Sequence, residues 1–168
     1  MLVSILAHEF GHAWASRFFG GRPAVALHGL GGLTHLGLGG AGRKEHFLIS
    51  LAGPMMGFVL AILVFLLAVF TYGRFPVLDE WVVYMLWINI GWSLFNLLPI
   101  LPMDGGQMLR DLVGMRHHRL CCLIGGILAS LLVVWAVLSG QYFMAVIVLL
   151  MAIGNFKGSL QIEGGVQR

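Results

Sequence analysis

The sequence predicts an all-α, polytopic membrane protein with about five transmembrane helices. Hydrophobic residues make up 59% of the 168-residue chain and charged residues only 10%, whereas charged residues average about 25% in soluble domains. Long uncharged stretches are the second observation, because about 20 apolar residues in a helix are needed to cross a hydrocarbon core of about 30 Å. These two observations exclude a water-soluble globular domain.

Uncharged stretches place the first three helices. Residues 1–19 are mostly apolar, and residues 47–72 contain no Asp, Glu, Lys or Arg. The third helix is predicted over 81–101, where Pro99 and Pro102 lack the amide donor that a regular helix requires. A broken helix is therefore expected at the end of this span.

Two further helices are predicted near the C-terminus. Residues 120–156 carry no charged side chain, and as one helix they would reach about 55 Å at 1.5 Å per residue. That length exceeds one membrane span, and Ser139-Gly140-Gln141 is a turn signal within the stretch. We therefore expect a transmembrane hairpin here.

A glycine-rich segment joins the first two predicted helices. Residues 20–46 hold nine glycines, and the sequence alternates loosely between apolar and small residues within them. This pattern predicts a short β-hairpin within 24–42. The alternative is a flexible glycine-rich linker.

The distribution of cations predicts the topology. With five spans, nine of the ten Lys and Arg residues fall on one side of the membrane and only Arg74 falls on the other. The positive-inside rule then puts residues 20–46, residues 104–119 and the C-terminus in the cytoplasm. As the membrane, we expect a bacterial or archaeal cell membrane. Nucleic acid is not an expected partner, because the cations are spread over several short loops without stacking aromatics.

The first predicted helix carries a polar stripe. Residues spaced by four lie on one helix face, and here they are Ser4, His8, His12 and Ser16. Lipid would not tolerate such a stripe, whereas the interior of a helix bundle would. We expect this helix to be packed inside the protein.

Residues 8–12 read His-Glu-Phe-Gly-His, which is the H-E-x-x-H pattern. Two imidazoles one helical turn apart can share a tetrahedral Zn²⁺, while the intervening Glu9 faces the water on the metal. Ionisable groups inside a membrane are costly and need a compensating interaction such as a metal. The alternative, two core histidines bonded to backbone carbonyls, leaves the Glu9 carboxylate buried without a cation.

A catalytic zinc usually has three protein ligands, so the histidine pair predicts a third. The carboxylates outside the uncharged stretches are Glu45, Asp79, Glu80, Asp104, Asp111 and Glu163. Asp104 is the best placed, because it follows the predicted helix break, and free backbone at membrane depth is tolerated only where it lines a cavity. Its alternative role is the N-cap of a helix over 105–114, and the two roles are compatible.

These motifs resemble those of the site-2 protease family of intramembrane zinc metalloproteases, peptidase family M50. The resemblance rests on the H-E-x-x-H helix and on Asn96 and Pro99 ahead of Asp104-Gly105, in the order and separation typical of the family. It covers residues 1–115. It implies one Zn²⁺ per chain, bound by His8, His12 and Asp104, with Glu9 as the catalytic base and Asn96 holding the substrate or the oxyanion.

A third stretch resembles the Gly-Pro motif of the same family. It is Ser50-Leu51-Ala52-Gly53-Pro54, and Met56 stands where many members have Asn. That departure removes one polar contact to substrate. Gly53 and Gly57 also fit a plain helix-packing face of the G-x-x-x-G type.

Together these features predict an intramembrane zinc metalloendopeptidase that cleaves transmembrane protein or peptide substrates within the bilayer, in regulated intramembrane proteolysis. Residues 1–115 would form its catalytic membrane core, and residues 116–168 a C-terminal transmembrane hairpin with a short cytoplasmic tail. The hairpin within 24–42 would hold extended substrate at a strand edge. The alternatives are a metal-ion transporter, since intramembrane His and carboxylate groups also mark ion pathways, and an inactive homologue that binds transmembrane helices.

Overall fold

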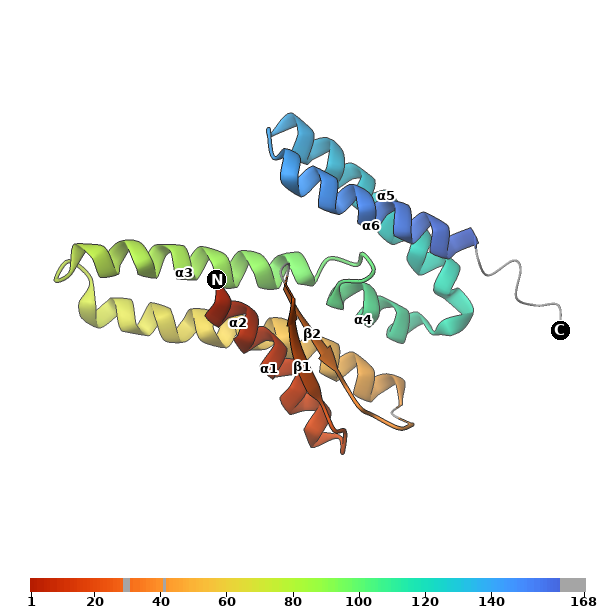
Figure 1. Cartoon of the computed structure of the whole chain (residues 1–168), viewed down its shortest axis with the longest axis horizontal. Coiled ribbons are helices and arrows are strands. Elements are labelled where there is room, and N and C mark those ends of the chain that lie inside the picture. Colours follow the sequence, from red (N-terminus) through yellow and green to blue (C-terminus); the bar gives the residue numbers. More distant parts are fainter. Residues whose placement is uncertain (29–30, 41, 161–168) are drawn as a thin grey trace. The chain divides into compact units, whose positions relative to one another are not determined.

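The computed structural model describes residues 1–28, 31–40 and 42–160. Within them the chain is mainly helical, with a small two-stranded sheet (Figure 1). The elements in chain order are α1 (Leu2–Phe18), β1 (Ala24–His28), β2 (Gly31–His35), α2 (Arg43–Thr71), α3 (Pro76–Asn96), α4 (Asp104–Val113), the 3₁₀ turn η1 (Met115–His117), α5 (His118–Leu138) and α6 (Tyr142–Leu160). The predicted helical class is thus confirmed.

The chain divides into two compact units, Met1–Leu97 and Leu98–Arg168. In the first unit, α2 is the central helix, because both α1 and α3 pack along it (Figure 1). Two close approaches make this packing possible. A Cβ atom added to Gly11 of α1 would lie 2.9 Å from the carbonyl carbon of Ala52, and one added to Gly57 of α2 would overlap the hydroxyl of Ser93 on α3.

The polar stripe of α1 is buried, as predicted. Its four members, Ser4, His8, His12 and Ser16, are all less than 9% exposed. The opposite surface of the helix is exposed, with Trp14 72% and Phe18 83% accessible. The helix therefore turns its polar side chains inward and its large apolar ones outward, the reverse of a helix in a water-soluble protein.

The predicted β-hairpin is present within the first unit. Strands β1 and β2 are antiparallel, and their register pairs Ala24 with His35 and His28 with Gly31. Strand β2 lies against α1, where the Ser16 hydroxyl donates a hydrogen bond of 2.6 Å to the carbonyl oxygen of Leu36. Residues 29, 30 and 41, which also fall in the predicted hairpin, lie outside the described part of the chain.

The boundaries of α2 and α3 differ from the predicted 47–72 and 81–101. Helix α2 begins four residues earlier, because the Glu45 carboxylate accepts a hydrogen bond of 2.6 Å from the backbone amide of Gly42 and caps a polar first turn. Helix α3 begins at Pro76, a favoured first helical residue. It ends at Asn96 and not at residue 101, because the missing amide of Pro99 prevents another helical turn.

The second unit contains a helical hairpin. Helices α5 and α6 pack together, and the predicted division at residues 139–141 is confirmed. Gly125 and Gly126 allow the close contact, since a Cβ atom at Gly126 would lie 2.8 Å from the Phe156 ring. The Asn155 amide donates a hydrogen bond of 2.6 Å to the carbonyl oxygen of Leu101, which fixes the segment before α4 to α6.

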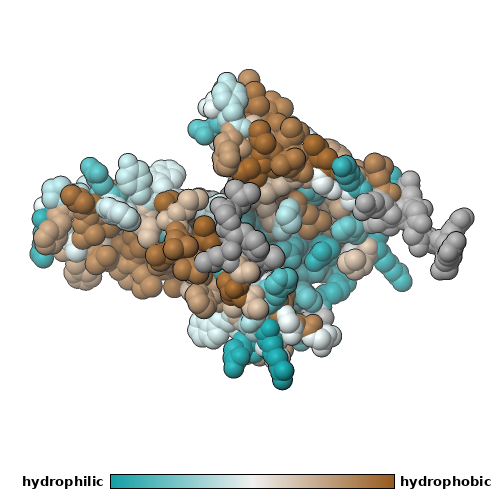
Figure 2. Space-filling view, viewed as in Figure 1, coloured by the Kyte–Doolittle hydropathy of each residue, from teal (hydrophilic) through white to brown (hydrophobic). Residues whose placement is uncertain are grey.

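Among the residues that the structure describes, three helical segments are long and apolar enough to cross a membrane. They are Arg43–Thr71, Met115–Leu138 and Tyr142–Leu160. Hydrophobic side chains predominate on the visible surface of these segments, and hydrophilic ones gather at their ends (Figure 2). Helix α1 has only 17 residues, and α3 carries Asp79, Glu80 and two asparagines, which lower its hydropathy. Helix α1 is therefore shorter, and α3 less apolar, than the three segments named above.

Candidate metal centre

Helix α1 places the two predicted metal-binding histidines side by side. Since the spacing is four residues, both rings leave the same face of the helix. The Nε2 atoms of His8 and His12 lie 3.1 Å apart, and the two rings meet edge to face at 82°. In a tetrahedral zinc site with Zn–N bonds of about 2.0–2.1 Å, two nitrogen ligands lie about 3.3 Å apart. The observed separation thus fits two ligands of one zinc ion.

A backbone carbonyl on α2 orients one of these rings. The Nδ1 atom of His12 lies 2.8 Å from the carbonyl oxygen of Ile49. Because a carbonyl oxygen only accepts, Nδ1 must carry the proton and donate it. The Nε2 atom of His12 then keeps its lone pair, which is the form that a metal requires. The contact with Ile49 uses Nδ1 and leaves Nε2 for a metal. His12 can therefore bond a backbone carbonyl and bind a metal at the same time.

The Gly-Pro stretch of α2 forms the wall behind the same ring. A Cβ atom added to Gly53 would overlap the His12 imidazole and lie 2.8 Å from its Cδ2 atom. Gly53 thus serves close packing, as the helix-packing interpretation of this glycine predicted. The group packed against it is the His12 ring. A side chain at position 53 would displace the ring.

Glu9 points toward the β-hairpin. Its side chain is 7% exposed, and its Oε2 atom accepts a hydrogen bond of 2.6 Å from the hydroxyl of Thr34 on β2. Gly32 of the same strand lies against the Glu9 side chain. Sequence reasoning missed Ile49, Gly32 and Thr34, because a backbone carbonyl leaves no sequence signal and the strand residues belong to no motif.

Asn96 is the last residue of α3. Its amide donates a hydrogen bond of 2.9 Å to the carbonyl oxygen of Trp92, one turn earlier in the same helix. Asn89 makes the equivalent bond, 2.7 Å long, to Met85, but it is only 1% exposed. The role of Asn96 toward substrate stays a prediction.

Asp104 belongs to the second unit, where it is the first residue of α4. The N-cap of this helix is Met103, so the alternative role of Asp104 as an N-cap is not observed. Its carboxylate lies in the first turn, where it interacts favourably with the helix dipole. A Cβ atom at Gly106 would lie 2.6 Å from the backbone nitrogen of Leu101. The start of α4 therefore packs tightly on the segment that precedes it.

The remaining carboxylates have other surroundings. Glu45 caps α2, and Asp79 accepts a hydrogen bond of 2.9 Å from the amide of Gly73 in the turn before α3. Asp111 lies 3.9 Å from the guanidinium of Arg110. Glu163 lies outside the residues that the structure describes.

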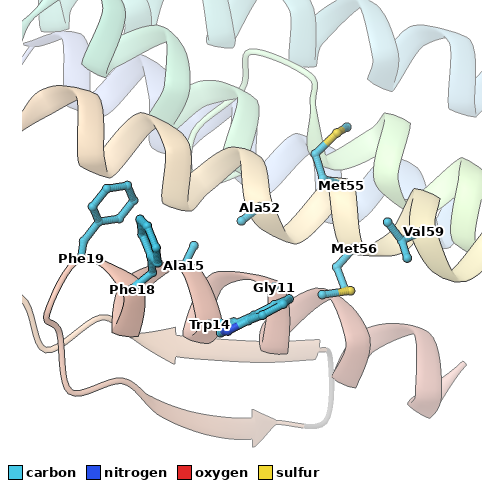
Figure 3. Close-up of a pocket in the computed structure, with 9 residues that line it drawn as sticks. All are labelled: Gly11, Trp14, Ala15, Phe18, Phe19, Ala52, Met55, Met56 and Val59. Carbon is cyan, nitrogen blue, oxygen red and sulfur yellow. The ribbon is translucent and has the colours of Figure 1, made fainter.

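An apolar pocket of about 370 Å³ lies between α1 and α2. Figure 3 shows Met56 extending from α2 toward the Trp14 ring on α1. All the side chains that line the pocket are apolar, from Gly11, Trp14, Ala15, Phe18, Phe19, Ala52, Met55, Met56 and Val59. Met56, at the position where the family resemblance leads us to expect Asn, is therefore part of an apolar surface.

Known proteins that are similar to this chain carry the name zinc metalloprotease. The chain is 37% identical to Rip3 of Mycobacterium tuberculosis over 123 residues, which is 70% of this chain and 30% of Rip3. It is 24% identical to a zinc metalloprotease of Methanocaldococcus jannaschii over 172 residues, which is 97% of this chain and 49% of that protein. The chain thus spans less than half the length of these two relatives.

A solved structure shares the fold. The site-2 protease from Methanocaldococcus jannaschii matches 94% of this chain and 74% of its own chain, with a TM-score of 0.68 and 24% sequence identity. The model of peptidase family M50 matches residues 1–80 and 76–139, most of the chain. The resemblance drawn from the two motifs is thereby confirmed, and the chain belongs to peptidase family M50.

Proposed function

We propose that this chain is an intramembrane zinc metalloendopeptidase that hydrolyses peptide bonds of membrane-protein substrates within the bilayer, in regulated intramembrane proteolysis. One observation carries the proposal: the Nε2 atoms of His8 and His12 converge to 3.1 Å on a helix that also carries the buried Glu9. The names of the relatives, which include a zinc metalloprotease, support the same activity.

The zinc ligands in this proposal are His8, His12 and Asp104. The two imidazoles supply nitrogen ligands, and a carboxylate oxygen is a suitable third ligand that leaves one position open. The support for Asp104 is its place in the second sequence motif, directly after the non-helical residues 97–103. When bound, the metal would polarise the scissile carbonyl group and lower the pKa of a water molecule.

Glu9 is the general base. Its Oε2 atom accepts a hydrogen bond from the Thr34 hydroxyl. This leaves the other carboxylate oxygen, Oε1, to take a proton from the attacking water. The same carboxyl group then gives this proton to the leaving amine, so that it ends the reaction ionised again. The Asn96 amide donates a hydrogen bond to the developing oxyanion.

The substrate is an extended stretch of a transmembrane protein or peptide, which pairs with an edge of the β1–β2 sheet. Helices α1, α2, α3, α5 and α6 form five spans. Residues 1–115 form the catalytic core and 116–168 the C-terminal hairpin and tail. The cation distribution supports a cytoplasmic location for residues 20–46 and the C-terminus in a bacterial or archaeal cell membrane.

The function is tested by comparing the membrane proteome of a Glu9→Gln strain with that of the wild type. Uncleaved membrane proteins should accumulate in the variant, because an amide nitrogen cannot accept the proton of water, while purified protein keeps its zinc. Glu45→Gln is the control, since this carboxylate only caps α2. Identical proteomes in the Glu9→Gln strain and the wild type would contradict peptidase activity, and a change in zinc uptake by cells would favour a transporter.

A further inference from the structure

Two residues of β2 face the Glu9 side chain. Gly32 and Thr34 are two positions apart, so both point to the same side of the strand. A Cβ atom added to Gly32 would lie 2.6 Å from Cδ and 2.7 Å from Oε1 of Glu9. The Thr34 hydroxyl lies 2.6 Å from Oε2. The carboxylate is therefore held against the strand at one oxygen and limited in its movement by the bare backbone of Gly32.

The contact of Thr34 with Glu9 has the features of a strong bond. An O–H···O⁻ distance of 2.6 Å lies in the range of charge-assisted hydrogen bonds, about 2.5–2.7 Å. The hydroxyl also lies 3.2 Å from the Glu9 backbone oxygen. Thr34 thus contacts both the main chain and the side chain of one residue, which fixes the carboxylate relative to its own helix.

The residue directly after β2 is bonded to α1 as well. The Ser16 hydroxyl donates to the carbonyl oxygen of Leu36 across 2.6 Å. Ser16 lies about two helical turns after Glu9 on α1, and Leu36 lies two residues after Thr34. The Glu9–Thr34 and Ser16–Leu36 bonds thus follow one another in the same direction along both segments. Together they hold β2 in a fixed position along α1. The Thr34 donor is therefore in place before any substrate arrives.

We propose that Thr34 is a positioning residue for Glu9, with Gly32 providing the space that the carboxylate occupies. By binding Oε2, Thr34 orients Oε1 toward the attacking water. This inference rests on the proposed function only in so far as Glu9 is the base. A misplacement of about 1 Å in a catalytic group can cost about 10²-fold in rate, so loss of the Thr34 hydroxyl should lower kcat by about 10- to 100-fold.

The test uses the full chain in detergent with zinc and a Lys-flanked single-span peptide of Leu and Ala with a central Asn-Gly pair as the probe. Thr34→Val keeps the β-branched shape and removes the hydroxyl, whereas Thr34→Ser keeps the donor. Thr71→Val is the matched control, because the Thr71 hydroxyl bonds the carbonyl of Leu67 in its own helix. Thr34→Val should lower kcat with KM and zinc content unchanged, and Thr34→Ser should restore kcat to within about threefold of the wild type.

A second readout does not depend on turnover. The infrared carboxylate band of Glu9 is identified as the band that Glu9→Gln removes. This band should shift in Thr34→Val, because the bonded oxygen loses its donor, and stay in place in Thr71→Val. Gly32→Ala should shift it as well, since the added Cβ atom would displace the carboxylate.

The outcomes separate the two proposals. An unshifted band, or wild-type kcat in Thr34→Val, would overturn the positioning role while leaving Glu9-dependent cleavage intact. Equal loss of kcat in Thr34→Ser and Thr34→Val would show that the side chain matters for packing and not as a donor. Wild-type protein whose cleavage of the peptide is absent or independent of Glu9 would contradict the proposed function and this inference together.

Discussion

His12 and Ile49 are joined across two helices by a hydrogen bond of 2.8 Å from an imidazole nitrogen to a backbone carbonyl. The bond sets the tautomer of His12, and Gly53 of the same helix α2 lies against the ring. The orientation of one proposed zinc ligand is thus decided by the backbone of a neighbouring helix. Loss of such outer contacts typically costs about 10–100-fold in metal affinity.

Gly53→Ala should weaken zinc binding by about 10- to 100-fold, because the new methyl group would push the His12 ring away from the Ile49 carbonyl. The measurement is competition with a chelator of known affinity. Gly91→Ala in α3 is the control, since nothing lies within 4 Å of a Cβ atom at that position. Both changes raise helix propensity equally. If both variants bind zinc like the wild type, the contact with Gly53 does not orient the ligand.

Asp104→Ala should lower the zinc content of the purified chain, because a third ligand is lost. Asp111→Ala should leave the zinc content near that of the wild type, since this carboxylate lies beside Arg110 in the same helix. Metal analysis of both proteins at equal concentration decides the point. A loss of zinc in Asp111→Ala alone would mean that the third ligand has been assigned to the wrong residue.

Asn96→Ala should lower kcat by about 10²-fold, the usual cost of losing one oxyanion donor, while zinc content and melting temperature stay close to those of the wild type. Asn89→Ala is a matched control, because both amides donate to the carbonyl four residues earlier in α3. This control should retain its turnover. Equal losses of turnover and stability in both variants would indicate that Asn96 is structural.

Asn155→Leu should lower the melting temperature of the chain in detergent. The change removes the 2.6 Å bond that ties the Leu101 carbonyl to α6, and side-chain hydrogen bonds in membrane proteins average about 0.6 kcal/mol. Ser130→Ala serves as the control, since the Ser130 hydroxyl bonds the carbonyl oxygen of Gly126 within its own helix. A melting temperature equal to that of the control would show that the segment before α4 is held by other contacts.

The sequence by itself determined which stretches are helical and which residues are proposed to carry the chemistry. The H-E-x-x-H spacing places His8, Glu9 and His12 on adjacent faces of one helix wherever that helix lies, because helical periodicity is a local property. The burial of the stripe from Ser4 to Ser16 also follows from local spacing and the low polarity of a membrane. The split near Gly140 follows from the limit that bilayer thickness sets on one helix.

Helix ends were harder to place, because they depend on single contacts that hydropathy does not record. The Glu45 carboxylate caps the start of α2 by accepting a hydrogen bond from the amide of Gly42. Pro76 begins α3 ahead of the uncharged stretch. Glu45 is charged and Pro76 is a residue that often breaks helices, so neither belongs to an uncharged helical stretch. A prediction based on uncharged stretches therefore begins α2 and α3 too late.

Only the tertiary structure decided which groups surround Glu9 and His12. The Ile49 carbonyl, the Gly53 backbone and the Thr34 hydroxyl reach these side chains from other elements, 37, 41 and 25 residues away in the sequence. Their positions depend on how closely α1, α2 and β2 approach, which is set by the fit of small residues at the contacts. No spacing rule links them, so the orientation of the Glu9 carboxylate and of the His12 ring is a property of the packing.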